Sequence, residues 1–131
     1  MMKHTILILF LFLSLLCHGQ SYKFFTTDRE LSSSLINKIY QDRNGMIWIA
    51  TEDGLNRYDG AKFITYKHDP ENEYSLCHNY VRVLYEDSKG RLFVGTYNGI
   101  QLYDPEIDSF SARAQWEDGK TFDSNIMSIL E

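Results

Sequence analysis

The sequence predicts an all-β protein: an incomplete β-propeller with two four-stranded antiparallel blades and the start of a third, preceded by a signal peptide. The first observation is an internal repeat, because the stretch 42–59 is written again at 87–104, a period of 45 residues. The second is that each copy holds short apolar runs separated by Asp-Gly or Asn-Gly pairs. A period of this length with several strands per copy is typical of a propeller blade.

Turn-forming and aromatic residues recur at fixed positions of the repeat. The opening Asp-x-x-Gly predicts a tight turn, because an Asp side chain can bond the backbone two residues on and Gly accepts a positive φ. The later Asp-Gly or Asn-Gly pair predicts a hairpin, and the aromatic positions predict blade core. The repeated residues are Asp42, Gly45, Trp48, Thr51, Gly54 and Tyr58 in the first copy and Asp87, Gly90, Phe93, Thr96, Gly99 and Tyr103 in the second.

Each copy predicts four strands. The runs 46–51 and 91–96 have the β-branched and aromatic composition of buried central strands. Small residues at one repeat position, Ala50 and Gly95, favour a close approach of neighbouring blades. Strands are expected at 36–40, 46–51, 55–58 and 63–66, then at about 81–85, 91–96, 100–103 and near Phe110. The expected blades are 34–67 and 79–113, the connections 68–78 and 114–123, and the truncated third blade 124–131, where Ile126, Ile129 and Leu130 take the positions of Ile36, Ile39 and Tyr40.

The first 33 residues are expected to lie outside these blades. Residues 1–19 combine a short basic start with an apolar run too short to span a membrane comfortably, which predicts a signal peptide cleaved before Gln20. A lipid anchor at Cys17 and an uncleaved signal anchor are the alternatives. Residues 20–33 are expected to form a lone strand and a lead-in. The strand at Tyr22–Thr27 resembles 62–66, and its own blade would lie at the far end of a longer chain.

A stack of two blades is smaller than the number of repeats that a stable repeat protein usually needs. Each blade buries its faces only against its neighbours, so a stable stack needs about three units. We therefore expect the partners of these residues to be the remaining blades and downstream domains of a longer chain. The fragment is not expected to be a complete stable domain by itself.

The net negative charge of the chain indicates which kinds of partner it can bind. Beyond residue 19 the chain has 12 Lys and Arg, the total of 13 less Lys3, against 18 Asp and Glu, which is a net charge of −6. No basic cluster is present, so nucleic acid is not expected as a partner. One cysteine, Cys77, remains in this part, which leaves no intramolecular disulfide; it is expected to act as a small apolar residue.

The sequence contains no pattern that predicts catalysis or a cofactor. The recurring Asp residues stand at turns, whereas a catalytic pair needs two carboxylates in different environments. A calcium loop is opposed by Lys89, which replaces Asn44 in the second copy. His68 and His78 have no Cys or acidic neighbour at zinc-ligand spacing. We expect no metal, no cofactor and no enzymatic activity in this chain.

Aromatic residues that do not repeat are the candidates for ligand binding. In propellers such residues lie in loops, where they can stack on a sugar ring or contact a partner protein. An oligosaccharide is therefore one possible ligand. The candidates are Tyr74, Tyr80, Tyr97 and Trp116.

The repeat resembles a known family. An Asp-x-x-Gly turn, then WIAT or FVGT, then DGLNRYD or NGIQLYD is similar to the two-component regulator propeller repeats of hybrid two-component systems in Bacteroides-like bacteria. The similarity covers about 33–110 and the start at 124. The family usually has Trp and Gly in W-x-G-T, whereas the first copy has Ala50 and the second has Phe93.

The resemblance implies a function for a longer parent protein. The fragment would be the N-terminal part of a periplasmic sensor propeller in a dimeric sensor histidine kinase anchored in the inner membrane. That parent would respond to glycan breakdown products and regulate transcription through a phosphorelay. The alternative is a secreted or surface propeller that binds or cleaves carbohydrate, or contacts proteins, without signalling. The sequence leaves open the ligand, the number of blades, and whether the truncation reflects a gene fragment or a choice of expressed segment.

Overall fold

The computed structural model describes residues 21–27, 30–111 and 128–129 and contains two four-stranded antiparallel sheets and no helix in these residues. Each sheet is a meander in which neighbouring strands along the chain are paired. The all-β prediction and the two-blade architecture are confirmed. The first sheet contains β1 (Ile36–Gln41), β2 (Ile47–Thr51), β3 (Gly54–Tyr58) and β4 (Phe63–Tyr66), and the second contains β5 (Val81–Glu86), β6 (Leu92–Thr96), β7 (Gly99–Asp104) and β8 (Ser109–Phe110).

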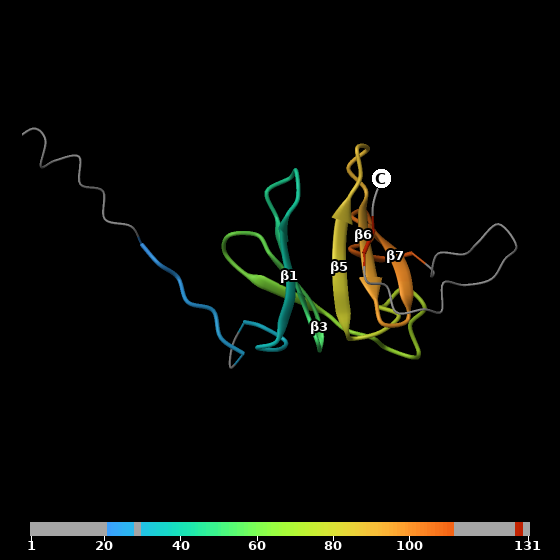
Figure 1. The fold of residues 1–131 in the computed structure, drawn as a ribbon, viewed down its shortest axis with the longest axis horizontal. Helices are drawn as coiled ribbons and strands as arrows, with labels where there is room; N and C mark the ends of the chain where they lie inside the picture. Colours follow the sequence, from blue (N-terminus) through green and yellow to red (C-terminus); the bar gives the residue numbers. More distant parts are fainter. Residues whose placement is uncertain (1–20, 28–29, 112–127, 130–131) are drawn as a thin grey trace, which may run out of the picture.

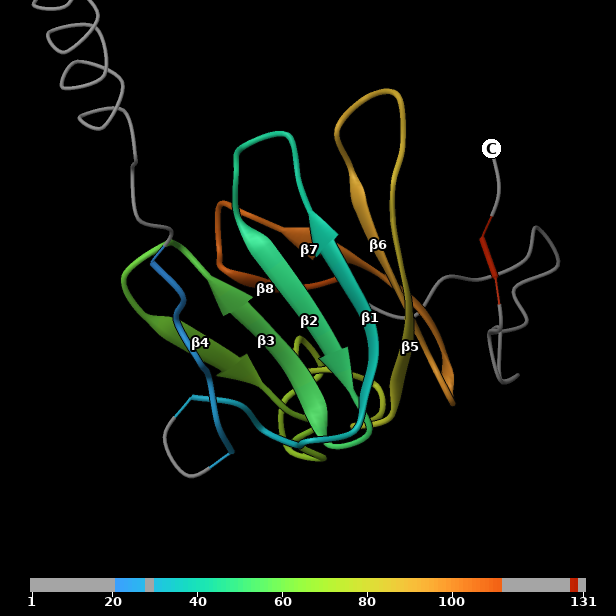
Figure 2. The same cartoon turned by 60° about the vertical axis from the view of Figure 1, so that its left-hand side comes forward.

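The two sheets stack face to face with their inner strands side by side. β1 contacts β5, and β2 also contacts β5, which places the start of each blade on the same side of the stack (Figure 1). Figure 2 shows the first sheet lying over the second. Both sheets carry a register irregularity at the same repeat position, between Ile36 and Lys38 and between Val81 and Val83. The two copies of the sequence therefore fold with the same local distortion.

Side chains alternate between the two faces of each sheet, and we name the faces by their aromatic residue. The back face carries Trp48 in the first sheet and Phe93 in the second; the front face is the opposite one. The core lies between the back of the first sheet and the front of the second, as alternation along a strand requires. Its buried members are Trp48, Ala50 and Leu55 from the first sheet, Val81, Leu84, Leu92, Val94 and Phe110 from the second, and Leu76 from the connection.

The repeated Asp residues hold the turns that the sequence predicts for them. The Oδ1 atom of Asp42 accepts hydrogen bonds from the backbone N–H groups of Asn44 at 2.9 Å and Met46 at 3.0 Å. In the second copy, Asp87 Oδ1 accepts from Lys89 and Arg91 at 3.0 and 2.8 Å. The turn glycines have positive φ angles, 85° at Gly45, 129° at Gly54, 81° at Gly90 and 124° at Gly99.

Three expectations need correction. The strand expected at Tyr22–Thr27 is not formed, because residues 21–26 have no strand pairing; instead the Phe25 ring packs on the first sheet. The connection 68–78 is not merely polar, since Leu76 is fully buried in the core. Phe93 and Tyr103 are only partly buried, whereas Trp48 and Tyr58 are buried. The expected signal peptide 1–19, the loop 114–123 and Trp116 lie outside the described residues, and Ser128 and Ile129 are in no strand.

Candidate functional site

One end of the stack brings together the β2–β3 turn, the β6–β7 turn and the connection from β4 to β5. This connection runs along the lower edge of the molecule in Figure 1. It is fastened to the first blade by the backbone N–H of Gly54, which donates to the carbonyl of Asn79 at 2.7 Å. The Asn79 side chain also donates to Asp53 at 3.1 Å, and Asp53 accepts an ion-pair bond from Lys67 at 2.6 Å. These contacts fix the loop that leads into the second blade.

Three rings gather at this end and form what we call the turn-end cluster: His78, Tyr80 and Tyr97. The Tyr97 ring lies 5.6 Å from the His78 ring and 6.3 Å from the Tyr80 ring, measured between centroids. Tyr97 sits in the β6–β7 turn and is 56% exposed, so its ring is presented to solvent. The His78 ring accepts a hydrogen bond from the Tyr80 backbone N–H at 2.9 Å, which fixes its orientation.

Polar groups surround the turn-end cluster. The Tyr80 hydroxyl donates to Glu52 Oε1 at 3.0 Å, and this bond is the main reason that the pKa of Tyr80 is raised. The Arg82 guanidinium lies 5.4 Å from the Tyr80 ring, within the range of a cation–π contact. An exposed ring beside a carboxylate and a guanidinium can stack on a ligand and hydrogen-bond to it. The turn-end cluster is therefore suited to binding a ligand.

The structure places two of the four predicted binding residues next to each other. Tyr80 and Tyr97 are neighbours, whereas Tyr74 has another place: its carbonyl accepts from the Phe110 N–H at 3.0 Å and from the Ser109 hydroxyl at 2.5 Å. The Tyr74 ring is 49% exposed. Sequence reasoning missed the contribution of Glu52. The 45-residue period was the signal available, because it places Glu52 and Tyr97 at the same position of adjacent blades.

A second polar group, also missed from the sequence, joins the outer strands of the two blades. Asp108, in the turn before β8, pairs with Arg57 of β3 at 2.6 Å. It accepts hydrogen bonds from the hydroxyls of Tyr66 at 2.5 Å and Tyr103 at 2.6 Å, and Arg57 also donates to the Tyr103 hydroxyl. The guanidinium of Arg57 lies 5.6 Å from the Trp48 ring. We call this group the inter-blade latch.

The inter-blade latch perturbs its titratable groups. Burial, and then the hydrogen bond to Asp108, raises the pKa of Tyr103 to about 12 and raises that of Tyr66 as well. Burial alone would raise the pKa of Asp108, but the two tyrosine hydroxyls and the Arg57 guanidinium outweigh it, so the pKa of Asp108 is lowered. The backbone of Asp108 has a positive φ of 51°, an uncommon conformation that Asp tolerates. The latch is thus an ionised, hydrogen-bonded link between blades.

Each blade contains a buried side-chain amide that bonds to the entering chain, and sequence reasoning did not predict this contact. The side-chain oxygen of Asn56 accepts from the Ser32 N–H at 3.1 Å. At the same repeat positions, the Gln101 oxygen accepts from the Cys77 N–H at 2.7 Å. Asn56 and Gln101 are 0% and 1% exposed, and each ties the entering chain to the third strand of its blade. The thiol of Cys77 lies 3.1 Å from the Thr96 hydroxyl, where Ser32 contacts Thr51, so Cys77 has a packing and bonding role.

Two further observations concern the part of the chain that the structure describes. No three His, Cys, Asp or Glu side chains gather there in an arrangement that could hold a metal ion. No helix with the length and apolar character needed to cross a membrane is found among the same residues.

The stacked four-stranded meanders define the class of protein: they are consecutive blades of a β-propeller. The family model described as two component regulator propeller matches residues 30–53 and 75–98, one match in each blade. The chain therefore contains one segment in each blade that is similar to a two-component regulator propeller repeat.

Similar proteins agree with this assignment. Over 73 residues the chain is 40% identical to Histidine kinase P4 of Formosa agariphila, a match that covers 53% of this chain and 5% of that protein. It is also similar to the extracellular domain of a hybrid two-component system from B. thetaiotaomicron, with 31% identity, a TM-score of 0.65, and coverage of 79% of this chain and 15% of that one. A second extracellular domain from the same organism, described as a one-component system, has 23% identity and a TM-score of 0.61 over 82% of this chain and 15% of that one, which shows the fold alone. The chain thus spans a small part of these relatives.

Proposed function

We propose that the chain is part of the extracytoplasmic sensing propeller of a two-component regulator, in a longer protein that carries a histidine kinase. The observation that carries this proposal is the pair of repeat matches, one in each blade. The similarity to a named histidine kinase and to an extracellular domain supports it. Kinase chemistry would belong to other parts of that protein, because the match to the named histidine kinase covers only 5% of its length.

We place the ligand contact of this fragment at the turn-end cluster. Tyr97 is the exposed ring, Tyr80 and His78 hold it from two sides, and Glu52 and Arg82 supply hydrogen-bonding groups nearby. Aromatic rings with polar neighbours suit the apolar face and the hydroxyl groups of a sugar ring. The ligand class that fits is therefore an oligosaccharide, in agreement with a sensor of glycan breakdown products.

A binding experiment tests the ligand class. The purified chain is titrated by calorimetry with oligosaccharides released from plant and algal polysaccharides. We expect one class to bind, and we expect Tyr97→Ala to weaken binding about tenfold or more, since an anchor ring contributes above 1.4 kcal/mol. Tyr74→Ala is the matched control, because its ring is similarly exposed but lies outside the cluster. Equal losses in the two variants, or no binding at all, would contradict the assigned contact.

A second experiment tests the signalling role independently. The coding DNA beyond the codon for Glu131 is read. Continued 45-residue repeats, then a membrane-spanning segment and kinase motifs, are the expected result. A stop codon directly after a closed set of blades would instead support the alternative, a secreted or surface propeller without signalling.

A further inference from the structure

We propose that the Asn44–Gly45 pair in the β1–β2 turn is a site of spontaneous covalent modification, at which asparagine converts to aspartate and isoaspartate. Glycine favours this reaction, because it has no side chain to keep its backbone nitrogen away from the preceding side-chain amide. Asn44 and Gly45 are both exposed. A Cβ atom added at Gly45 would meet nothing within 4 Å, so the reacting groups have room to move.

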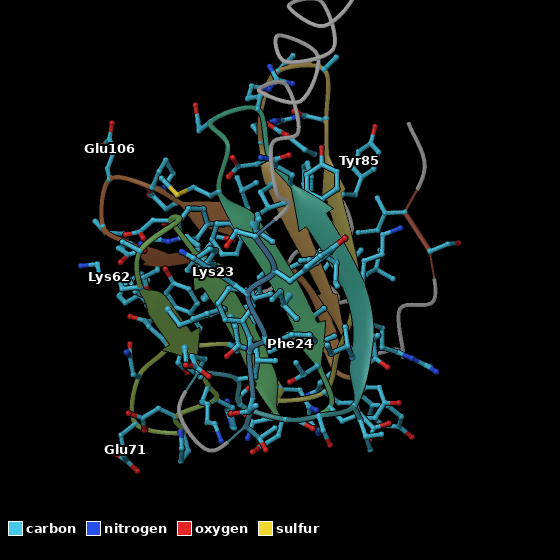
Figure 3. All side chains as sticks on the ribbon, turned by 90° about the vertical axis from the view of Figure 1, so that its left-hand side faces the viewer. Lys23, Phe24, Lys62, Glu71, Tyr85 and Glu106 are labelled. Atoms are coloured by element: carbon cyan, nitrogen blue, oxygen red, sulfur yellow. The ribbon has the colours of Figure 1, made fainter. Side chains whose placement is uncertain are left out.

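The exposure of this turn does not depend on which blades lie beside it. Figure 3 shows the β1–β2 turn at the upper end of the two sheets, where Tyr85 of β5 is labelled. In the second blade, whose front face the first sheet covers, Lys89 stands at the repeat position of Asn44 and is also exposed. A neighbouring blade in front of the first sheet should therefore leave Asn44 open to solvent.

The reaction needs only water as a co-reactant. The backbone nitrogen of Gly45 bonds to Cγ of Asn44 and loses its proton, while the bond from Cγ to the amide nitrogen breaks and ammonia leaves. The product is a five-membered succinimide ring. Water then opens the ring: cleavage between Cγ and nitrogen gives aspartate, and cleavage between the backbone carbonyl carbon and nitrogen gives isoaspartate, whose main chain passes through the former side chain. No oxidation or reduction takes place.

The other Asn-Gly pair of the described residues, Asn98–Gly99, is held in a different environment. Asn98 is half-buried and Gly99 is buried at the start of β7, where it pairs with Thr96. The Thr96 hydroxyl accepts a hydrogen bond from the Asn98 N–H at 3.0 Å and donates to the Gly99 carbonyl at 3.1 Å. Ring closure would break these bonds in a site closed to water. The same two-residue sequence is therefore protected in one turn and open in the other.

Ring closure at Asn44 also requires the turn to open locally. The Gly45 N–H donates to the Asp42 carbonyl at 2.9 Å, and this bond must break before the nitrogen can turn toward the side-chain amide. The bond from the Asn44 N–H to Asp42 Oδ1 is exposed, so water can replace the lost partners at once. Exposed turns open at low free energy, whereas buried strand residues open only at a higher cost.

The two Asp-Gly pairs in the first blade are less suited to the equivalent reaction, in which a protonated carboxyl group loses water. At Asp53–Gly54, the glycine N–H donates to the Asn79 carbonyl at 2.7 Å, and Gly54 is buried. At Asp59–Gly60, backbone hydrogen bonds lower the pKa of the Asp59 carboxyl, which keeps it ionised at neutral pH. Asn44–Gly45 therefore combines exposure with a neutral, reactive amide.

Isoaspartate at position 44 would disturb a contact between the blades. It adds one methylene group to the main chain between the N–H groups of residues 44 and 46, and Asp42 Oδ1 can then no longer hold both. Arg43, in the same turn, pairs with Glu86 of the second sheet at 2.7 Å, and its backbone N–H donates to that carboxylate at 3.1 Å. The Glu86 side chain is 5% exposed, so loss of its partner is costly. Modification thus weakens one link between the blades.

The test incubates the whole chain at mildly alkaline pH and physiological temperature, with samples taken over several weeks. Each sample is digested at acidic pH, and mass spectrometry with fragmentation measures the conversion of Asn44 and Asn98. We expect Asn44 to convert about tenfold faster or more, since an opening free energy lower by about 1.4 kcal/mol gives this ratio. In concentrated urea, where the fold is lost, the two Asn-Gly pairs should convert at similar rates.

Matched variants separate the modification from other changes during incubation. Asn44→Lys is the first, because Lys89 holds the same position in the second blade and makes the same turn bond to Asp87. It should accept few methyl groups from an isoaspartate methyltransferase and keep its urea midpoint during incubation, whereas the midpoint of the parent chain falls. Asn98→Lys should accept methyl groups like the parent chain.

Three results would overturn the assigned site: no conversion of Asn44, equal conversion of Asn44 and Asn98 in the folded chain, or methylation of Asn44→Lys at the level of the parent chain. A urea midpoint of the parent chain that stays constant while Asn44 converts to isoaspartate would overturn the effect on the contact between the blades.

Discussion

The two blades share one backbone plan but satisfy it with different side chains. In the first blade, the second oxygen of Asp42 accepts from the indole N–H of Trp48 at 2.8 Å. In the second blade Phe93 has no such donor, and the guanidinium of Arg91 takes its place, with Arg91 Nε 2.6 Å from Asp87 Oδ2. The Trp-to-Phe change in the repeat is therefore compensated two residues earlier. In both copies the turn Asp accepts a side-chain hydrogen bond, but the residue that donates it differs between the copies.

Burial differs between the blades at identical repeat positions. Leu84 is 4% exposed and Ile39 is 58% exposed. The difference comes from position in the stack, because the second blade has the first blade on its front face. This comparison teaches that a repeat pattern predicts the direction in which a side chain points, and that a neighbour determines whether the side chain is buried.

The largest expected effect sharpens this contrast in burial. Leu84→Asp places an unpaired carboxylate in the core and should lower the free energy of unfolding by about 4 kcal/mol. Ile39→Asp at the matching position should change it by less than about 0.5 kcal/mol, because the site is exposed. Both values come from urea unfolding followed by Trp fluorescence at low protein concentration. Similar losses would show that the two front faces are equally covered in solution.

The next largest change in stability is expected at the repeat position that holds Trp48 in the first blade and Phe93 in the second. Trp48→Phe should lower the free energy of unfolding by about 2 kcal/mol, because a fully buried side chain loses volume and the Asp42 carboxylate loses a donor. Phe93→Trp, which adds a donor where Arg91 already serves, should be nearly neutral. The measurement is the urea midpoint of each variant.

A double variant checks whether Arg91 and a Trp at 93 are interchangeable donors. Arg91→Met should lower the urea midpoint, because Asp87 loses its guanidinium partner. Adding Phe93→Trp should restore part of this loss, since the indole N–H can reach the carboxylate as Trp48 does. Additive behaviour of the two substitutions would contradict the proposed compensation.

The smallest expected effect concerns the inter-blade latch and its pH dependence. The pKa of Asp108 is lowered in the folded state. Its contribution is therefore fully present above the ordinary carboxyl pKa of about 4 and is lost progressively as the pH falls from there through the lowered pKa of the folded state. Asp108→Asn should reduce stability at pH near 7 by less than about 1 kcal/mol, because the side chain is 45% exposed and screened by solvent.

At pH near 3 the same substitution should make a smaller difference, because the unfolded chain then largely carries a proton on this carboxyl and part of the stabilisation is lost. Urea midpoints at the two pH values provide the measurement. Glu106→Gln serves as a control for a nearby exposed carboxylate. A difference between the parent and Asp108→Asn that does not shrink in acid would show that the latch acts through packing and not through charge.

Much of the fold followed from the sequence. The turn residues and the 45-residue period predicted all eight strands within a few residues, because turn chemistry and alternation act over short distances. The segment Tyr22–Thr27, predicted to be a lone strand, has no paired neighbour among the described residues. Of the candidate site, Tyr80 and Tyr97 were predicted as ligand contacts, but His78 and Glu52 were not, because their proximity depends on how the connecting loop crosses between blades.

By itself, the sequence determined the architecture of each blade: where the chain turns, which residues alternate to each face, and that both copies fold alike. These properties are local, since they depend on turn residues and on the two-residue period of a strand. Only the tertiary structure decided which copy of each face is covered, that Arg57 meets Asp108 across the blades, and that the Phe25 ring packs on the first sheet. These are contacts between distant segments, and the stacking of the sheets, with the ends of the chain around it, brings them together.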